Sequence, residues 1–154
     1  MNSKSRETHP MATAIILGPA AESYTELPFY SCRVPAGFPS PAQDHMEQAL
    51  SLDALLEIDA PHTYLVRAQG HSMEGAGIFD GDVLVVSRAR DARKGDIVIA
   101  AINGDTFVKR YTRQGDQVVL CSENPKYPPR YILEGDELLI WGVVTGSIRR
   151  HSHA

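Results

Sequence analysis

The stretch from Asp96 to Thr112, DIVIAAINGDTFVKRYT, decides the fold class of this chain. Two runs rich in β-branched and aromatic residues flank the dipeptide Asn103-Gly104. Asn and Gly tolerate the positive φ angles that a two-residue hairpin turn requires. The stretch therefore predicts two antiparallel strands joined by a tight turn.

Short β-rich segments continue on both sides of this hairpin. They are TYLVRA (63–68), DVLVVS (82–87), QVVLCS (117–122) and the C-terminal DELLIWGVVTGSIR (136–149). Between residues 46 and 59, MEQALSLDALLEID predicts a short helix capped by Ser51 or Asp53. Many short strands with few helices predict a mostly β protein with a compact antiparallel fold.

Residues 1–42 differ from the rest, because they are rich in Pro, Ser, Ala and Gly and show no sustained period. They predict a mobile N-terminal arm. Within the arm, VPAGFPS (34–40) combines two prolines with small residues. Such a peptide can lie extended in a cleft as an added strand, but an ordinary Pro/Gly linker has the same composition.

Composition and charge limit the classes of function. The chain has 154 residues, of which 43% are hydrophobic and 22% charged, values typical of one soluble domain with a tail. A net charge of -4 without a long basic run argues against direct DNA binding and favours protein partners. Cys32 and Cys121 show no paired spacing, and the histidines lack zinc-ligand spacing. We therefore expect a cytoplasmic protein without a metal, a cofactor or a membrane span.

The segment GHSMEGAGIFDGD (70–82) contains a candidate nucleophile, Ser72, in a glycine-rich turn that leads into the next strand. A nucleophilic serine needs an accessible hydroxyl and nearby backbone N–H groups to hold an oxyanion, and the N–H of Ser72 itself is a candidate. His71 is poorly placed as its base, because adjacent strand residues point to opposite faces. An ordinary turn serine gives the same pattern, so the motif alone leaves both readings open.

Lys109 occupies an unusual position in the second strand of the hairpin. Strand alternation places Phe107, Lys109 and Tyr111 on one face and Val108 and Arg110 on the other. If the aromatic face is buried, desolvation lowers the pKa of the amine, which could then act as a general base. The usual alternative is a lysine that extends its amine into solvent.

Four segments together resemble a known family. They are GFPSPAQDHMEQ (37–48), RAQGHSMEGAGIFDGDVLVVSRA (67–89), KGDIVIAAINGDTFVKR (94–110) and WGVVTGSI (141–148). These segments resemble the UmuD-like accessory subunits of SOS mutagenesis polymerases, within the wider family of LexA-type self-cleaving repressors. The most specific part is GHSM followed by AGI and DGD, with FVKR at a fixed distance.

The resemblance implies a Ser-Lys dyad serine peptidase on an all-β fold. Ser72 matches the nucleophile of the family and Lys109 its general base. Members cut their own chain at an Ala-Gly or Cys-Gly bond that precedes the catalytic domain. Ala36-Gly37 occupies that position here.

The resemblance also implies an organisation and a set of partners. Residues 1–36 would be an arm removed by self-cleavage, and residues 37–154 the peptidase domain. Partners would be a second copy of the chain, the RecA filament on single-stranded DNA, and a UmuC-type polymerase. In LexA-type repressors a DNA-binding domain precedes the cleavage site, and the 36 residues before Ala36-Gly37 offer no room for one, so we expect the accessory subunit.

Two other functions remain open at this stage. The β-domain could be a binding module without enzyme activity whose arm is only a tether, and the chain would then stay intact under all conditions. It could also be a processing peptidase that acts on other proteins, although such enzymes with a similar dyad carry a membrane anchor.

Overall fold

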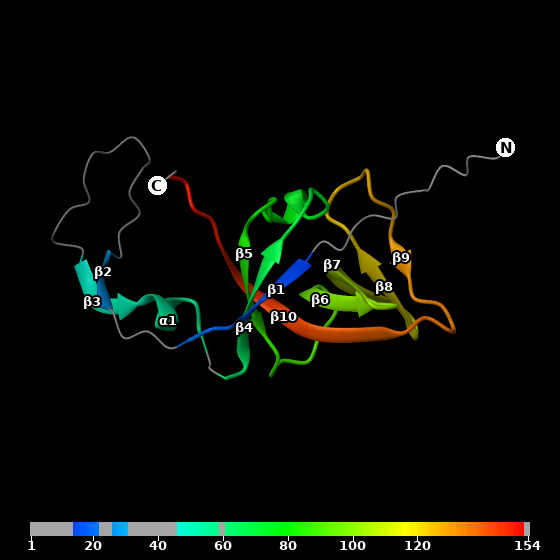
Figure 1. Cartoon of the computed structure of the whole chain (residues 1–154), viewed down its shortest axis with the longest axis horizontal. Helices are drawn as coiled ribbons and strands as arrows, with labels where there is room; N and C mark the ends of the chain where they lie inside the picture. The colour runs from blue at the N-terminus through cyan, green and yellow to red at the C-terminus, as the bar shows by residue number, and fades with distance from the viewer. Residues whose placement is uncertain (1–13, 22–25, 31–45, 59–60, 153–154) are drawn as a thin grey trace.

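An eight-stranded antiparallel sheet forms most of the computed structural model, which describes residues 14–21, 26–30, 46–58 and 61–152 (Figure 1). The strand order is β1-β4-β5-β10-β6-β7-β8-β9. The strands are β1 (Ala14–Pro19), β4 (Thr63–Ala68), β5 (Val83–Ser87), β6 (Ile97–Ile102), β7 (Asp105–Gln114), β8 (Gln117–Cys121), β9 (Arg130–Tyr131) and β10 (Leu138–Ile148). This architecture confirms the predicted mostly β, antiparallel fold.

The predicted hairpin joins β6 to β7. Asn103 has φ 50° and Gly104 has φ 88°, as a two-residue hairpin turn requires. The register pairs Ile102 with Asp105 and places Val98 opposite Lys109. The predicted strands at 63–68, 82–87, 117–122 and 136–149 are also present, as β4, β5, β8 and β10, whereas the two-residue β9 was not predicted.

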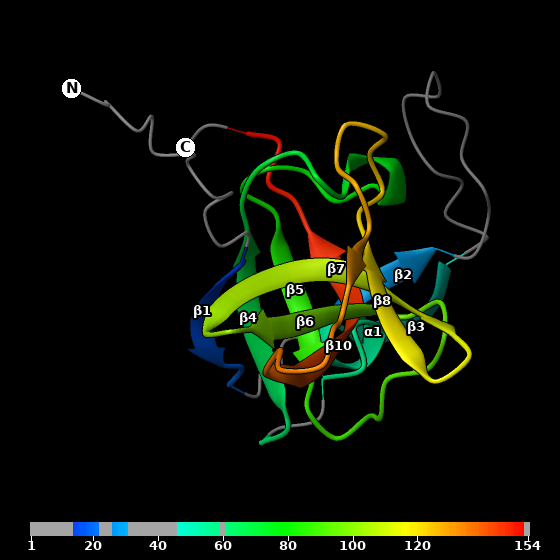
Figure 2. The same ribbon diagram turned by 90° about the vertical axis from the view of Figure 1, so that its right-hand side faces the viewer.

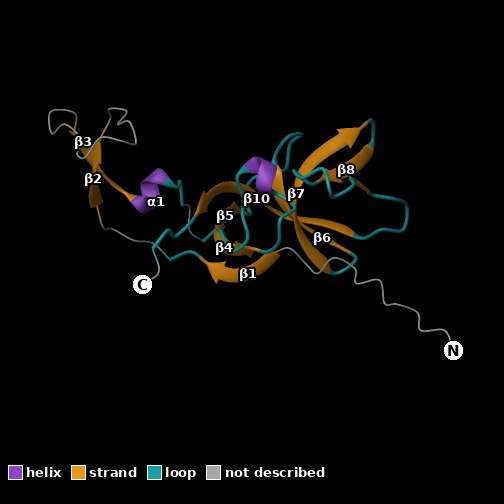
Figure 3. Cartoon of the chain, turned by 90° about the horizontal axis from the view of Figure 1, so that it is seen from above, coloured by secondary structure: helices purple, strands orange, loops and turns teal. Residues whose placement is uncertain are grey.

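A smaller antiparallel pair, β2 (Glu26–Tyr30) and β3 (Met46–Ser51), lies at one end of the molecule and leads into α1 (Leu52–Leu55) (Figures 1 and 3). The Ser51 hydroxyl accepts a hydrogen bond from the Ala54 N–H at 3.1 Å, which confirms Ser51 as the helix cap. The predicted short helix begins directly after Ser51 but is only four residues long, and residues 46–51 before it form β3, which pairs with β2. In the described ranges, no helix is long and apolar enough to cross a membrane.

The structure also differs from the predicted mobile arm over residues 1–42, since β1 and β2 lie in this region. β1 forms one edge of the main sheet and pairs with β4, with Ala14 opposite Ala68 and Pro19 opposite Tyr64. Its sequence, AIILGP, lacks the alternation of apolar and polar residues that identifies a half-buried strand, and most of its residues are exposed. The segment VPAGFPS lies outside the described residues.

The main sheet is strongly curved, so that β1 approaches β7 (Figure 2). Residues from β1, β4, β5, β6, β7 and the turn after β4 fill one core cluster: Ala14, Val66, Ala68, Met73, Ile78, Leu84, Val86, Ile99 and Val108. A second cluster contains Val98, Ala100, Ile102, Leu120 and Val143. Phe107 and Tyr111 pack against the second cluster and Val108 lies in the first, so β7 has the two faces that alternation predicted.

Candidate active site

Ser72 lies in the turn between β4 and the 3-10 turn η2 (Glu74–Ala76), and only 3% of its surface is exposed. Its backbone carbonyl accepts a hydrogen bond from the Glu123 N–H at 2.8 Å, and the Glu123 carbonyl accepts one from the Gly75 N–H at 2.8 Å. A Cβ on Gly75 would lie 2.5 Å from that Glu123 oxygen, so the close approach requires glycine. The turn that contains Ser72 (the serine turn) is thus joined to Glu123 by backbone hydrogen bonds.

An ion pair between the buried Asp82 and the exposed Arg149 fixes the far end of this turn. Asp82 is 1% exposed, and its carboxylate accepts hydrogen bonds from the Phe79 N–H at 2.8 Å and from the Arg149 guanidinium at 2.7 and 2.8 Å. The hydrogen bond from Arg149 is the main reason that the pKa of Asp82 lies below its ordinary value. Met73 and Ile78 join the first core cluster, so the turn is anchored at both ends.

Lys109 is half-buried on the face of β7 that it shares with Phe107. Its Nζ lies 5.9 Å from the Phe107 ring centroid, and the fully buried Val98 pairs with it across the sheet. Burial lowers the pKa of Lys109, and the nearby Cys121 opposes this shift to a smaller extent. The structure therefore agrees with the predicted desolvated lysine rather than with one fully extended into solvent.

The amine of Lys109 donates a hydrogen bond to the Ser122 hydroxyl at 2.5 Å. In the described part of the chain, no hydrogen bond joins Lys109 to Ser72. The two are connected through one short segment, because Ser122 directly precedes Glu123, whose N–H binds the Ser72 carbonyl. The fold thus brings both predicted residues to the segment at the end of β8, and in the described part of the chain they are linked through this segment rather than by a hydrogen bond of their own.

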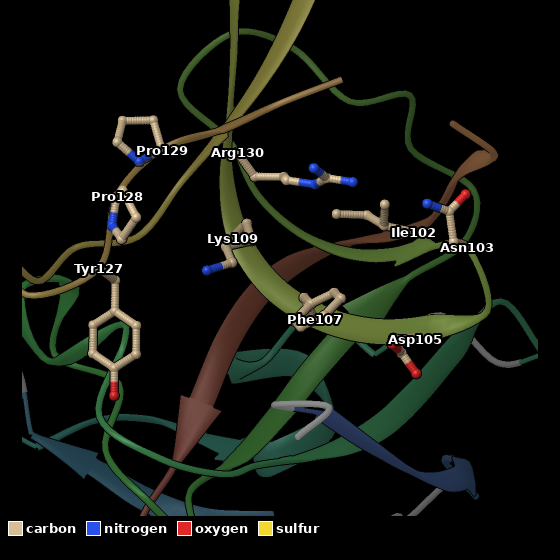
Figure 4. Close-up of a pocket in the computed structure, with 9 residues that line it drawn as sticks. All are labelled: Ile102, Asn103, Asp105, Phe107, Lys109, Tyr127, Pro128, Pro129 and Arg130. Carbon is tan, nitrogen blue, oxygen red and sulfur yellow. The ribbon is translucent and has the colours of Figure 1, made fainter. Parts of the chain in front are cut away.

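A groove of about 570 Å³ runs along β7 beside Lys109 (Figure 4). It is lined by Ile102, Asn103, Asp105, Phe107, Lys109, Tyr127, Pro128, Pro129 and Arg130. Aliphatic, aromatic and proline side chains predominate in this lining, which does not include Ser72. Its shape and chemistry suit an extended segment with apolar side chains.

The remaining predicted residues contribute less to this site. Ala36, Gly37 and Cys32 lie outside the described residues. His71 is exposed, and its Nδ1 lies 2.7 Å from a carboxylate oxygen of Glu74. Among the described residues, no group of three or more His, Cys, Asp and Glu side chains could hold a metal ion.

Sequence reasoning missed Ser122 and Glu123, although one signal was available. The β7–β8 hairpin pairs Gln114 with Gln117 across its turn. Counting outward from this pair, one residue on each strand at a time, places Ser122 opposite Lys109. Two separately predicted strands do not fix this register, so they do not identify the hydroxyl beside the lysine.

A serine on a glycine-rich turn, a partly desolvated lysine and a peptide-sized groove on a curved β-sheet form a candidate Ser-Lys peptidase site. Residues 28–145 match the family model described as Peptidase S24-like, and the chain belongs to this family.

Three individual relatives show which proteins this chain is similar to. The chain is 40% identical to Protein MucA of Salmonella typhimurium over 141 residues, which are 92% of this chain and 97% of the relative. It is 47% identical to Protein ImpA of Salmonella typhimurium over 58% of this chain and 61% of that one. A LexA repressor of Polaromonas is 46% identical over 51% of this chain and 33% of its own length.

These comparisons confirm the resemblance inferred from the sequence. The chain is a UmuD-like SOS mutagenesis protein with an S24 self-cleaving peptidase domain. Its enzyme class is that of the LexA-type Ser-Lys serine peptidases.

Proposed function

We propose that this protein cleaves its own chain between Ala36 and Gly37, with Ser72 as nucleophile and Lys109 as general base. The observation that carries the proposal is the half-buried amine of Lys109, whose pKa is lowered by burial and which lies beside an apolar groove. Desolvation makes the neutral amine accessible at a lower pH than in water, and only the neutral amine can accept a proton.

The chemistry follows the usual sequence of acyl transfer. The Ser72 Oγ attacks the carbonyl carbon of Ala36 while the Lys109 amine takes the hydroxyl proton. We assign the backbone N–H of Ser72 as a donor to the resulting oxyanion. The C–N bond then breaks, and the protonated Lys109 returns its proton to the amine of Gly37. Water hydrolyses the acyl ester, which restores Ser72 and leaves a carboxylate on Ala36.

The substrate in this proposal is the chain's own arm. Residues 1–36 are the part released, and residues 37–154 form the peptidase domain that remains. Pro35 pushes Val34 toward an extended conformation, and Gly37 lets the leaving side bend away without a Cβ clash. An extended apolar segment of this kind suits the groove along β7.

The partners follow from membership among UmuD-like proteins. We infer a cytoplasmic homodimer that meets the RecA filament on single-stranded DNA, without binding DNA by itself. The filament would shift the arm toward its groove-bound state rather than supply a catalytic group. The shortened chain would then join a UmuC-type polymerase for translesion synthesis.

The test is the intact mass of the full-length protein after incubation at about pH 10, which favours the neutral amine of Lys109 because burial lowers its pKa. The Ser72→Ala chain, treated in the same way, is the control. We expect two new masses that correspond to residues 1–36 and 37–154, and neither of them in the control.

A folded chain that stays intact at this pH and with activated RecA filament would overturn the proposal. That result would favour a binding module whose arm is only a tether. Cleavage of an unrelated peptide added in trans would instead indicate a processing peptidase.

A further inference from the structure

Lys109 and Ser122 face one another at the end of the β7–β8 pair. The last regular pair in this register is Arg110 with Cys121, and one further step places Lys109 opposite Ser122. Residues directly opposite in an antiparallel pair carry their side chains on the same face. The contact between the two side chains is therefore a consequence of strand register.

The contact itself is short and shielded. The Lys109 Nζ donates to the Ser122 Oγ at 2.5 Å, and the bond is partly buried. A neutral amine has two N–H bonds and one lone pair, and it rotates about its Cε–Nζ bond. A fixed acceptor for one N–H limits the directions in which the lone pair can point.

The same segment also holds the serine turn. The Glu123 N–H binds the Ser72 carbonyl at 2.8 Å, and the Asn124 side-chain amide donates to the His71 carbonyl at 2.8 Å. Ser122, Glu123 and Asn124 thus bind the lysine amine at one end and the backbone around the serine at the other. A displacement of this segment would change the separation of the two groups.

We propose that Ser122 is a positioning residue for the self-cleavage reaction. Its hydroxyl holds the amine of Lys109 so that the lone pair of the amine is available to the Ser72 hydroxyl. The inference rests on the proposed function, in which Lys109 is the general base. Ser122 acts through the lysine and does not itself touch the scissile bond.

The first test compares self-cleavage rates against pH for the full-length wild type, Ser122→Ala and Ser122→Thr. Loss of the acceptor should lower the maximal rate at least about tenfold, because the amine loses its orientation. The Ser122 hydroxyl accepts a stronger hydrogen bond from the charged ammonium than from the neutral amine, so it raises the pKa of Lys109. Removing this hydroxyl should therefore move the midpoint of the rate–pH profile down by about half a pH unit. Ser122→Thr keeps the hydroxyl and should recover both the rate and the midpoint.

Thr112→Val is the matched control, because it removes another hydroxyl hydrogen bond of the same strand pair. The Thr112 Oγ1 donates to the Val119 carbonyl at 2.9 Å and lies 3.8 Å from the Cys121 Sγ, and among the described residues it makes no hydrogen bond with Lys109 or Ser122. We expect this control to keep the wild-type midpoint. A Ser122→Ala chain with the wild-type rate and midpoint would overturn the positioning role.

A second measurement does not depend on cleavage. Titration of the Lys109 side-chain carbon resonance by NMR in the Ser72→Ala chain reports the pKa of its amine directly. Adding Ser122→Ala should lower that pKa, and an unchanged titration would contradict the inference. If the wild type does not cleave but this titration shifts, the proposed function fails while the Lys109–Ser122 coupling stands.

Discussion

β7 and β1 belong to the same sheet but differ in the strands they pair with and in the core residues they contribute. β7 has ten residues, pairs with both β6 and β8, and contributes the almost fully buried Val108 to the first core cluster. β1 has six residues, pairs with β4 alone, and its register shifts between Ile16 and Gly18. Residues 15–17 of β1 are between 42% and 46% exposed.

This difference matches the roles that the two strands have in the proposal. A general base must be held in a fixed geometry, and β7 is constrained on both edges and both faces. The part of the arm that the structure describes near β4 buries only the small side chains of Ala14 and Ala20. We therefore expect the peptidase domain to keep its fold when the arm is released.

Lys109→Met should give the largest effect. The substitution removes the general base, and we expect the self-cleavage rate to fall at least about a thousandfold. Methionine fits the apolar face beside Phe107, so the free energy of unfolding at pH 7 should stay within about 1 kcal/mol of wild type. Intact mass and urea unfolding measure the two quantities.

Lys94→Met is the control, because Lys94 is an exposed lysine in the loop before β6. It should cleave at the wild-type rate. Continued cleavage by Lys109→Met would show that Lys109 is not the general base and that β7 has a structural role only.

Val108→Thr should give the next largest effect. Val108 is 1% exposed, and threonine has nearly the same shape but places a hydroxyl in the first core cluster. Burial of that hydroxyl should lower the free energy of unfolding by about 2 kcal/mol. Urea unfolding in the Ser72→Ala background measures this loss without interference from cleavage, and a loss below about 0.5 kcal/mol would mean that β7 is no better held than β1.

The pH dependence of stability should show the desolvation of Lys109. At low pH both the folded and the unfolded chain carry the ammonium, and the folded chain bears the cost of its burial. In the folded protein the pKa of Lys109 is lowered, so its amine loses its proton as the pH rises through that value. In the unfolded chain the same amine keeps its proton until the pH reaches its ordinary pKa. The free energy of unfolding therefore rises between these two pKa values, with a slope of at most about 1.4 kcal/mol per pH unit.

The measurement compares Ser72→Ala with the double variant Ser72→Ala, Lys109→Met over that range of pH. The difference between their free energies of unfolding should change in favour of the lysine chain as pH rises. A difference that does not vary with pH would mean that the amine of Lys109 is as hydrated in the folded protein as in the unfolded one.

Local sequence was sufficient to predict the central hairpin of this fold and the face of β7 on which Lys109 lies. The hairpin at Asn103-Gly104 follows from turn chemistry, and the strand alternation around Lys109 gave its face correctly. Ser72 and Lys109 were selected because their motifs and their distance resemble a known family. Residue type alone also predicted a helix cap at Ser51 or Asp53, and Ser51 is the cap.

Features that depend on distant pairing were missed. β1 forms only because the edge of β4, more than forty residues later, supplies its hydrogen-bond partners. β3 occupies a sequence with helical spacing because β2 pairs with it. Ser122 required the β7–β8 register to be counted, and no local pattern pairs Asp82, the first residue of the predicted strand 82–87, with Arg149.

Ile16→Thr should give the smallest effect and completes the comparison with Val108→Thr. Ile16 is 45% exposed on the edge strand, and threonine keeps the β-branching that favours a strand. Its hydroxyl can reach water, so we expect a loss of about 0.5 kcal/mol or less in urea unfolding of the Ser72→Ala chain. Threonine would then cost at least about four times more at Val108 on β7 than at Ile16 on β1, although the change at Ile16 also removes a methyl group. Equal losses at the two sites would show that β1 is as integral to the domain as β7, and self-cleavage would then have to disrupt the fold when it releases the arm.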